Sequence, residues 1–336
     1  MSKEFDNKES MILEDPEWPK ASSWLKGDLA KNVHIKGHGK FSVLGVPLSQ
    51  ASPPPHGSHF TPIAIRDALD GYSPFAAGVG WPEPMNIDLT EIVPIDLGNL
   101  GSIVYLDNIK AQEEIEKLVS EKVRKSGLSN FPNLTVYLGG DDGIIRPVLK
   151  GCCKDLSKIG LLTLDAHHDV RVYYRNLGPH NGSPVRGLID DGLKGENIIQ
   201  VGISTFTNSI HYRRYCEKKG IKIIGVNEAR RKEVGICVEN ALEELSEKCD
   251  AIFVDFDLDV TELGFGPACG GAKPGGLSPW EVHEAAFAVG KNPKVMGLCI
   301  VEVDSTKDIT GNGVLHAALT MLHAAAGFVT RRTKII

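Results

Sequence analysis

Two clusters of acidic and imidazole side chains each follow a short apolar segment, and they limit what this chain can fold into. Residues 159–164 form an apolar run that is typical of a buried parallel strand, and the motif D-A-H-H-D occupies residues 165–169 directly after it. Residues 251–254 form a second apolar run, which Asp255, Asp257 and Asp259 follow. Because open α/β sheets place their sites at the carboxyl ends of strands, we expect both clusters to belong to a functional site.

The spacing of the second cluster points to a metal ion. Side chains alternate in an extended chain, so Asp255, Asp257 and Asp259 are expected on one face. Like charges this close repel by several kcal/mol unless another group neutralises them. A divalent cation is the usual neutralising partner, and we therefore predict a metal site.

Composition excludes several other classes of protein. A length of 336 residues fits one large α/β domain, and a net charge of −6 argues against nucleic acid as the partner, which leaves a small molecule. The seven Cys are scattered without metal-finger spacing, which indicates reduced thiols in a cytoplasmic protein. Residues 1–25 contain no signal-peptide core, and we expect no apolar run long enough to cross a membrane.

Strands and helices are expected to alternate along most of the chain. Residues 1–39 are read as an irregular N-terminal arm and residues 40–336 as a catalytic domain, with a long loop at 71–90. Strands are predicted at 41–46, 92–95, 134–138, 159–164, 198–203, 222–226, 251–254 and 295–301. Helices are predicted at 61–69, 107–124, 144–150, 185–191, 209–219, 236–248, 279–289 and 314–329. This alternation favours an α/β fold, with a mostly parallel doubly wound sheet and helices on both faces.

Two helices carry finer predictions. Thr61 is expected to cap the helix at 61–69, with Pro62 at its first position. In the helix at 107–124, the apolar positions expected to face inward are Ile109, Ile115, Leu118 and Val119.

Several motifs together resemble the ureohydrolases, the family of arginase, agmatinase and formimidoylglutamase. Residues 165–169 match the family's D-A-H-x-D, and residues 302–304 (E-V-D) resemble its E-V-[ND]-P segment. Residues 255–276 fit S-x-D-x-D…P-[GSA]…G, with Asp255 at the usual Ser position. The position of the Pro favours Asp257 and Asp259 as ligands over the pair Asp255 and Asp257. The resemblance covers residues 45–325 and implies a three-layer arginase-like fold and a homo-oligomer.

The resemblance implies a binuclear Mn²⁺ site that activates water to hydrolyse a linear amidine or guanidine C–N bond. Oxygen-rich ligands with one or two imidazoles favour manganese over zinc. By resemblance, one ion would be held by Asp142, Asp165, Asp169 and Asp257, and the other by Asp165, His167, Asp257 and Asp259. Asp169 would also accept a proton, Glu302 would bind the cationic end of the substrate, and His180 would be the proton shuttle.

The chain departs from the family pattern at two of these positions. Residues 139–143 read G-G-D-D-G where the family has G-G-D-H-S, so Asp142 replaces a histidine ligand. Aspartate is shorter and adds negative charge, so the first metal could bind with altered affinity or be absent. His180 is offset by one residue from the family's loop histidine. Five further histidines, His56, His59, His211, His316 and His323, are read as surface or core residues. His168 is read as a hydrogen-bonding residue behind the metals, and Asp255 as a hydrogen-bond acceptor or a partner of an Arg.

The loop that follows the D-A-H-H-D motif suggests the substrate. It carries Arg171 and Arg175, and its pattern looks more like formimidoylglutamases than arginases. Because an Arg pair can bind a carboxylate bidentately, the sequence favours N-formimidoyl-L-glutamate or a guanidino acid. Alternatives are agmatinase-type activity or a degenerate, non-catalytic homologue. A single-zinc deacetylase of the same broad fold is disfavoured because both Asp169 and Asp259 are present.

Overall fold

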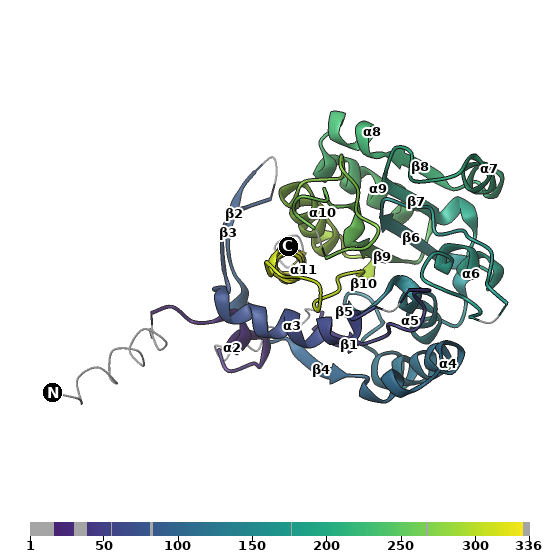
Figure 1. Cartoon of the computed structure of the whole chain (residues 1–336). Helices are drawn as coiled ribbons and strands as arrows, with labels where there is room; N and C mark the ends of the chain where they lie inside the picture. The colour runs from purple at the N-terminus through teal and green to yellow at the C-terminus, as the bar shows by residue number, and fades with distance from the viewer. Residues whose placement is uncertain are drawn as a thin grey trace.

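The structure, a computed structural model, describes residues 17–29, 39–54, 56–80, 83–175, 177–266 and 268–331. Within these ranges, eight parallel strands form one sheet in the order β4-β1-β5-β10-β9-β6-β7-β8 (Figure 1). In chain order they are β1 (Phe41–Val46), β4 (Ile95–Asn99), β5 (Leu134–Gly139), β6 (Ile159–Leu164), β7 (Ile198–Ile203), β8 (Lys222–Gly225), β9 (Ala251–Asp257) and β10 (Val295–Val301). The predicted α/β fold with a parallel sheet is confirmed.

Helices cover both faces of the sheet. They are α2 (Ala21–Leu25), α3 (Thr61–Ala68), α4 (Asn108–Val119), α5 (Ile145–Cys152), α6 (Pro184–Asp190), α7 (Ile210–Lys219), α8 (Val226–Arg231), α9 (Val234–Lys248), α10 (Pro279–Lys291) and α11 (Asn312–Thr330). Side-chain alternation in the strands separates the apolar core into two clusters. In β5, Val136 and Leu138 pack with α3, α9, α10 and α11, while Tyr137 between them packs with α4, α5 and α6. The three-layer arrangement follows from this alternation.

Several local predictions are wrong, and the reasons are tertiary. The segment predicted as a loop at 71–90 contains an antiparallel hairpin of β2 (Phe75–Val79) and β3 (Met85–Asp88), which stands apart from the main sheet in Figure 1. Its residues are mostly exposed, so its sequence lacks the alternation of apolar and polar residues that predicts a strand. The strand expected at 92–95 begins only at Ile95, where the chain pairs with β1.

Two predictions about side chains also fail. Phe60, not Thr61, is the N-cap of α3, and the Thr61 hydroxyl instead donates a hydrogen bond to the Val303 carbonyl. Ile109 is exposed on α4, whereas Ile115 and Val119 are buried as predicted.

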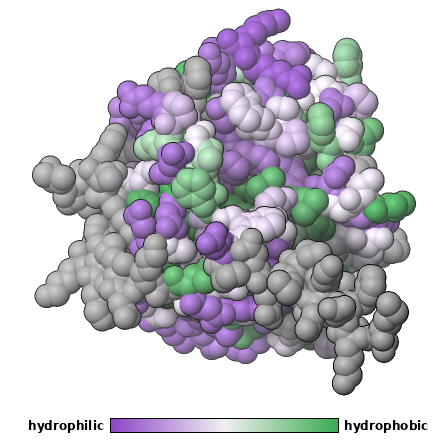
Figure 2. All heavy atoms as spheres, turned by 90° about the vertical axis from the view of Figure 1, so that its left-hand side faces the viewer, coloured by the Kyte–Doolittle hydropathy of each residue, from purple (hydrophilic) through white to green (hydrophobic). Residues whose placement is uncertain are grey.

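The described part of the N-terminal arm contains one short helix, α2, that the sequence pattern does not predict. Trp24 on this helix is 1% exposed, and its indole N–H donates to the Ile92 carbonyl. The division of the chain at residue 39 stays a prediction, because residues 1–16 and 30–38 lie outside the described ranges. On the face that Figure 2 shows, hydrophobic residues are scattered among hydrophilic ones.

Helix α11 is the one described helix that is long and apolar enough to cross a membrane by length and composition, contrary to the sequence prediction. However, 78% of its apolar stretch is buried inside the protein. Helix α11 packs against α10 through glycines: a Cβ on Gly327 would lie 2.1 Å from the Phe287 carbonyl oxygen. The position of α11 in the core of the protein therefore explains its apolar sequence.

Replacing Gly327 with Ala should destabilise the protein. Alanine favours a helix interior by about 1 kcal/mol over glycine, but the clash involves a backbone oxygen that cannot rotate away. Overpacking costs about 1–3 kcal/mol, and a clash with a fixed backbone atom belongs at the upper end of this range, so we expect a net loss of about 2 kcal/mol. Urea unfolding measures this, with Gly264→Ala as control because its Cβ would meet no atom within 4 Å. Equal midpoints for both variants would contradict the packing described here.

Three histidines lie between α10 and α11, of which His316 is buried and His283 and His323 are half-buried. His283 Nε2 is 2.9 Å from His316 Nδ1, and the His283 and His323 rings stack at 4.6 Å. Burial, with a smaller effect of the neighbouring imidazoles, lowers the pKa of His283 to about 3 and that of His316 to about 4. His316 is therefore a core residue, whereas His323 is half-buried.

Acid should therefore destabilise the fold through these histidines. Their pKa values are lower in the folded state than the ordinary 6.5, so the unfolded chain binds more protons as the pH falls below 6.5. At pH 5, His283 and His316 each contribute a loss of about 2 kcal/mol in the free energy of unfolding. Urea midpoints at pH 7 and pH 5, with excess Mn²⁺ present, should show a smaller acid effect in His316→Gln. His211 is exposed, so the control variant His211→Gln should retain the full acid effect. A pH dependence in His316→Gln equal to that of the wild type would contradict the role of the buried histidine.

Candidate metal centre and active site

The strand order brings the sequence motifs together at one edge of the sheet. Strands β5, β10, β9 and β6 are neighbours at the centre of the sheet, and all run in the same direction. Each ends in a segment that carries predicted site residues: Asp142 after β5, Glu302 after β10, Asp257 and Asp259 at the end of β9, and the D-A-H-H-D motif after β6. Motifs more than 150 residues apart in the sequence therefore meet.

Two groups of side chains have the geometry of a metal site. In the first group, ligand atoms of Asp165, His167 and Asp259 all lie within 4.8 Å of one another. In the second group, ligand atoms of Asp142, Asp169 and Asp257 do the same. All six residues are those that the sequence predicts as metal ligands. Asp165 falls only in the first group and Asp257 only in the second, whereas the prediction gives both residues to each ion.

Backbone hydrogen bonds hold the carboxylates in place. The Asp257 Oδ1 accepts from the Asp259 N–H at 2.8 Å, and the Asp165 Oδ1 accepts from the His167 N–H at 2.5 Å. Asp169 and Glu302 have φ angles of 48° and 66°, which non-glycine residues rarely adopt. Such strain persists only where the surrounding structure fixes it, and here it lies at two predicted functional residues.

The buried carboxylates have almost no cationic partners within the described chain. His167 is the exception: its Nδ1 lies 2.8 Å from Asp259 Oδ2 and 3.5 Å from Asp165 Oδ1. Burial first, and then the charge of Asp255 and Asp169, raises the pKa of Asp142 well above its usual value. Burial and the charge of Asp259 do the same for Asp257. The cluster is therefore unfavourable as it stands at neutral pH.

The residues present fit a pair of divalent cations. Both carboxylate oxygens of Asp142 and the Oδ2 of Asp165 are buried and have no hydrogen-bond partner among the described residues. Buried charged oxygens without partners are rare, because each leaves a large desolvation cost uncompensated. Carboxylate oxygens with one imidazole are the donor set that manganese prefers. Asp142 thus offers unpaired oxygens at the position where the family has a histidine.

Two further aspartates have roles that the sequence leaves open. Asp141 does not face the metal groups: its Oδ2 accepts from the N–H groups of Ala51 and Ser52, each at 2.9 Å. It therefore fixes the loop before α3 to the end of β5. Asp255 is 2% exposed, its Oδ1 has no partner among the described residues, and its pKa is raised well above the usual value by burial and by Asp169. It belongs to the acidic cluster and pairs with no Arg there.

The structure separates the histidines of the D-A-H-H-D motif by role. His167 points into the first metal group. His168 is 2% exposed, and its Nδ1 lies 2.7 Å from Gln200 Oε1, so it is a hydrogen-bonding residue outside the metal groups, as predicted.

His180, the predicted proton shuttle, has no free ring nitrogen. Its Nδ1 accepts from the Gly182 N–H at 3.1 Å, and its Nε2 lies 3.1 Å from the Val172 carbonyl oxygen. The ring also stacks on Tyr174 at 4.3 Å and is buried. These contacts give His180 the role of holding the loop over the site in its conformation.

The two predicted substrate-binding arginines are both exposed. The Arg171 N–H donates to the Gly182 carbonyl, and the Arg171 charge acts on His167 and His180, which places its guanidinium near the site. Arg175 has no hydrogen bond or ion pair with any described residue. Both side chains are therefore available to a ligand.

Glu302 lies beside the second metal group and contacts a histidine that the sequence analysis assigned to the surface or core. Its Oε1 accepts from the Asp142 N–H at 2.8 Å and from the Asn181 amide at 3.1 Å. Its Oε2 lies 3.9 Å from His56 Nε2. Burial, and then the charge of Asp141, raises the pKa of Glu302 to about 8. No motif signalled His56 or Asn181, because both reach the site from loops of irregular sequence.

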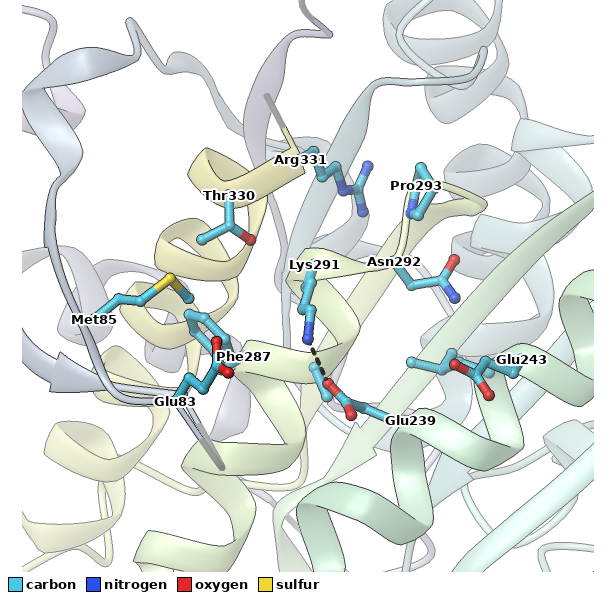
Figure 3. A pocket seen from close by; sticks show the side chains of 13 residues that line it. Glu83, Met85, Glu239, Glu243, Phe287, Lys291, Asn292, Pro293, Thr330 and Arg331 are labelled. Atoms are coloured by element: carbon cyan, nitrogen blue, oxygen red, sulfur yellow. Dashed lines mark hydrogen bonds and ion pairs between the residues drawn. The ribbon is translucent and has the colours of Figure 1, made fainter. Parts of the chain in front are cut away.

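A pocket of about 520 Å³ lies away from these residues (Figure 3). Glu83 and Met85 of the β2-β3 hairpin and Phe287 of α10 line it, and Lys291 pairs with Glu239 at 2.8 Å. Because residues 291–293 precede β10, the pocket is at the opposite edge of the sheet from the acidic cluster. None of the predicted site residues lines it.

Comparison with known proteins supports the same family. The model of the arginase family matches residues 39–327. The chain is 33% identical to formimidoylglutamase of Halalkalibacterium halodurans over 84% of this chain and 86% of the relative. It is 26% identical to the human mitochondrial guanidino acid hydrolase, covering 82% and 74% of the two chains. The chain therefore belongs to the arginase family, and the prediction of a ureohydrolase-class enzyme is confirmed.

Solved structures agree with this assignment. Formimidoylglutamase from Bacillus subtilis superposes with a TM-score of 0.80 at 31% identity, covering 94% of this chain and 93% of that one. A formiminoglutamase from Trypanosoma cruzi, solved with Mn²⁺, has a TM-score of 0.77 at 19% identity over 94% and 99% of the two chains. The three-layer arginase-like fold is confirmed.

Removing divalent metal should destabilise the protein at neutral pH, because the buried carboxylates then repel one another. Excess ligand at 100 times its Kd stabilises a protein by about 2.7 kcal/mol, which corresponds to a shift of roughly 4 °C for each bound ion in a chain of this size. We expect the chelator-treated protein to melt at least about 4 °C lower, and added Mn²⁺ to restore the melting temperature.

Two variants control this experiment. Asp257→Asn should lose most of the response to Mn²⁺, because Asp257 lies in the second metal group. Asp250→Asn, on the exposed turn before β9, should keep it. A metal-free protein that melts at the same temperature and takes up no Mn²⁺ would contradict the proposed centre.

Proposed function

We propose that the protein hydrolyses the formimidoyl C–N bond of N-formimidoyl-L-glutamate with two Mn²⁺ ions per subunit. The observation that carries this proposal is the pair of three-residue metal groups at the ends of the central strands. Relatives at 33% identity are named formimidoylglutamase, and neighbouring solved structures contain Mn²⁺. The second metal group contains Asp142, whose unpaired oxygens support binding rather than loss of the ion there.

The residues of the two metal groups would have the following roles. Asp142, Asp169 and Asp257 would hold one ion, and Asp165, His167 and Asp259 the other. The family resemblance would have Asp165 and Asp257 contribute to both ions. The chemistry that such ions supply is a pKa of bound water lowered towards about 7, which makes hydroxide available at neutral pH. Asp169 is buried beside this position and is the candidate proton acceptor.

Glu302 is the candidate partner of the cationic amidine. Its Oε1 is fixed by two N–H donors, so the carboxylate is oriented before the substrate arrives. Because the Glu302 side chain is already ordered, substrate binding does not have to immobilise it. The fixed carboxylate favours one orientation of the bound substrate. The exposed Arg171 and Arg175 are candidate partners of the substrate carboxylates. Because both ring nitrogens of His180 are engaged, we do not assign a proton transfer to it.

We also propose that the protein works in the cytoplasm as a homo-oligomer. All seven cysteines are free, which supports a reducing compartment. The family resemblance supports the homo-oligomer, and light scattering of the purified protein measures it.

A hydrolysis panel with the Mn²⁺-loaded protein tests the substrate. We expect kcat/KM for N-formimidoyl-L-glutamate to exceed that for a guanidino acid and for agmatine by at least about tenfold, because only the first combines the formimidoyl group with two carboxylates for Arg171 and Arg175. Formamide release reports the first reaction, and urea release reports the other two.

The same panel separates the alternatives. Preference for agmatine, which has no carboxylate, would contradict the role given to the arginines and favour an agmatinase-type enzyme. No product from any of the three compounds, with at most one metal per subunit, would indicate a degenerate homologue. Arg171→Ala should lower kcat/KM for the acids, with Arg214→Ala on the exposed face of α7 as control.

A further inference from the structure

His56 lies in the wall of the site, on the proline-rich loop that precedes α3. Its side chain is 7% exposed, and its Nε2 is 3.9 Å from Glu302 Oε2. Its Nδ1 is buried and has no hydrogen-bond partner among the described residues. A buried imidazole with both nitrogens free of protein partners is unfavourable unless another molecule supplies a hydrogen bond.

The loop that carries His56 is fixed at both ends. At one end, Asp141 accepts hydrogen bonds from the N–H groups of Ala51 and Ser52. At the other end, Asp304 accepts from the Gly57 N–H, and a Cβ on Gly57 would lie only 2.4 Å from Asp304 Oδ1. The position of the His56 ring is therefore set before any substrate binds.

Glu302 and His56 both have hydrogen-bonding capacity that no described residue uses. The Glu302 Oε1 already accepts two N–H groups, whereas its Oε2 has no hydrogen-bond donor among the described residues. The 3.9 Å between Oε2 and His56 Nε2 is too long for a direct hydrogen bond. An amidine group carries N–H donors on both nitrogens, so it can satisfy both acceptors at once.

We propose that His56 is a substrate-binding residue, which accepts an N–H of the amidine group while Glu302 Oε2 accepts another. The proposal rests on the proposed function, because it takes the amidine to be bound at Glu302. It adds a second contact to the cationic end of the substrate, supplied by a loop rather than by a strand end.

The charges around His56 agree with this role. Burial lowers the pKa of His56. The charge of Asp304 partly offsets this decrease, and the charges of Lys307 and His59 add to it. A neutral imidazole keeps one nitrogen as an acceptor, whereas a protonated ring would repel a cationic substrate. Glu302 and Asp304, the acidic groups that face the ring, lie on the segment after β10.

Substitutions of His56 test the proposal. His56→Phe keeps a ring but removes the acceptor, and should raise KM for N-formimidoyl-L-glutamate about tenfold or more, with kcat changed less than threefold. His56→Gln keeps an acceptor and should stay within about threefold of the wild type in KM. The control is His59→Phe in the same loop, since His59 contacts Ser49 and Phe60 rather than Glu302. It should leave KM unchanged.

A binding measurement makes the test independent of turnover. Calorimetry with formamidine as probe on the Mn²⁺-loaded protein should give an affinity about tenfold weaker for His56→Phe than for the wild type, with equal Mn²⁺ content and melting temperature. Equal probe affinity and equal KM in the two proteins would overturn the role of His56. A wild-type protein that binds the probe but hydrolyses none of the three substrates would overturn the proposed function, while a weaker His56→Phe would still support the contact.

Discussion

The mutual repulsion of buried carboxylates at the ends of four neighbouring strands is the constraint on which this structure depends. Asp142, Asp165, Asp169, Asp255, Asp257 and Asp259 are nearly inaccessible to solvent, and within the described chain His167 is the one cationic group seen among them. Burial makes each charge expensive, and proximity makes the cluster more so. Divalent cations relieve both costs at once, which explains why ligand atoms with unfilled hydrogen-bonding capacity persist in the core.

The surrounding structure holds this arrangement rigidly. Backbone N–H groups orient Asp165 and Asp257, and Asp141 and Asp304 fix the loop that carries His56. Asp169 and Glu302 adopt positive φ angles that only a well-packed environment sustains. Metal ligands on strand ends and substrate contacts on fixed loops give a site that is largely formed before ligands bind, and the helices on both faces supply the packing that keeps it so.

The sequence predicts the central strands closely and the periphery poorly. Strands β6 and β7 have the predicted bounds because a buried parallel strand is a continuous apolar run with no competing interpretation. The β2-β3 hairpin and α2 were not predicted, because one is mostly exposed and the other is a single short turn held by Trp24. The metal-binding candidates were predictable because several carboxylates in two motifs, each directly after an apolar strand, match the spacing of one family, whereas a single aspartate such as Asp141 after β5 has a structural role.

The sequence by itself determined the family, the parallel α/β fold and the six metal-binding candidates, since these are encoded in local motifs and periodicity. Only the tertiary structure decided which carboxylates share a group, that the ring nitrogens of His180 are occupied, and that His56 faces Glu302. The physical reason is that local sequence fixes an element and its exposed face. The partner of a side chain depends instead on strand order and loop path, which bring together residues such as His56 and Glu302 from distant parts of the chain.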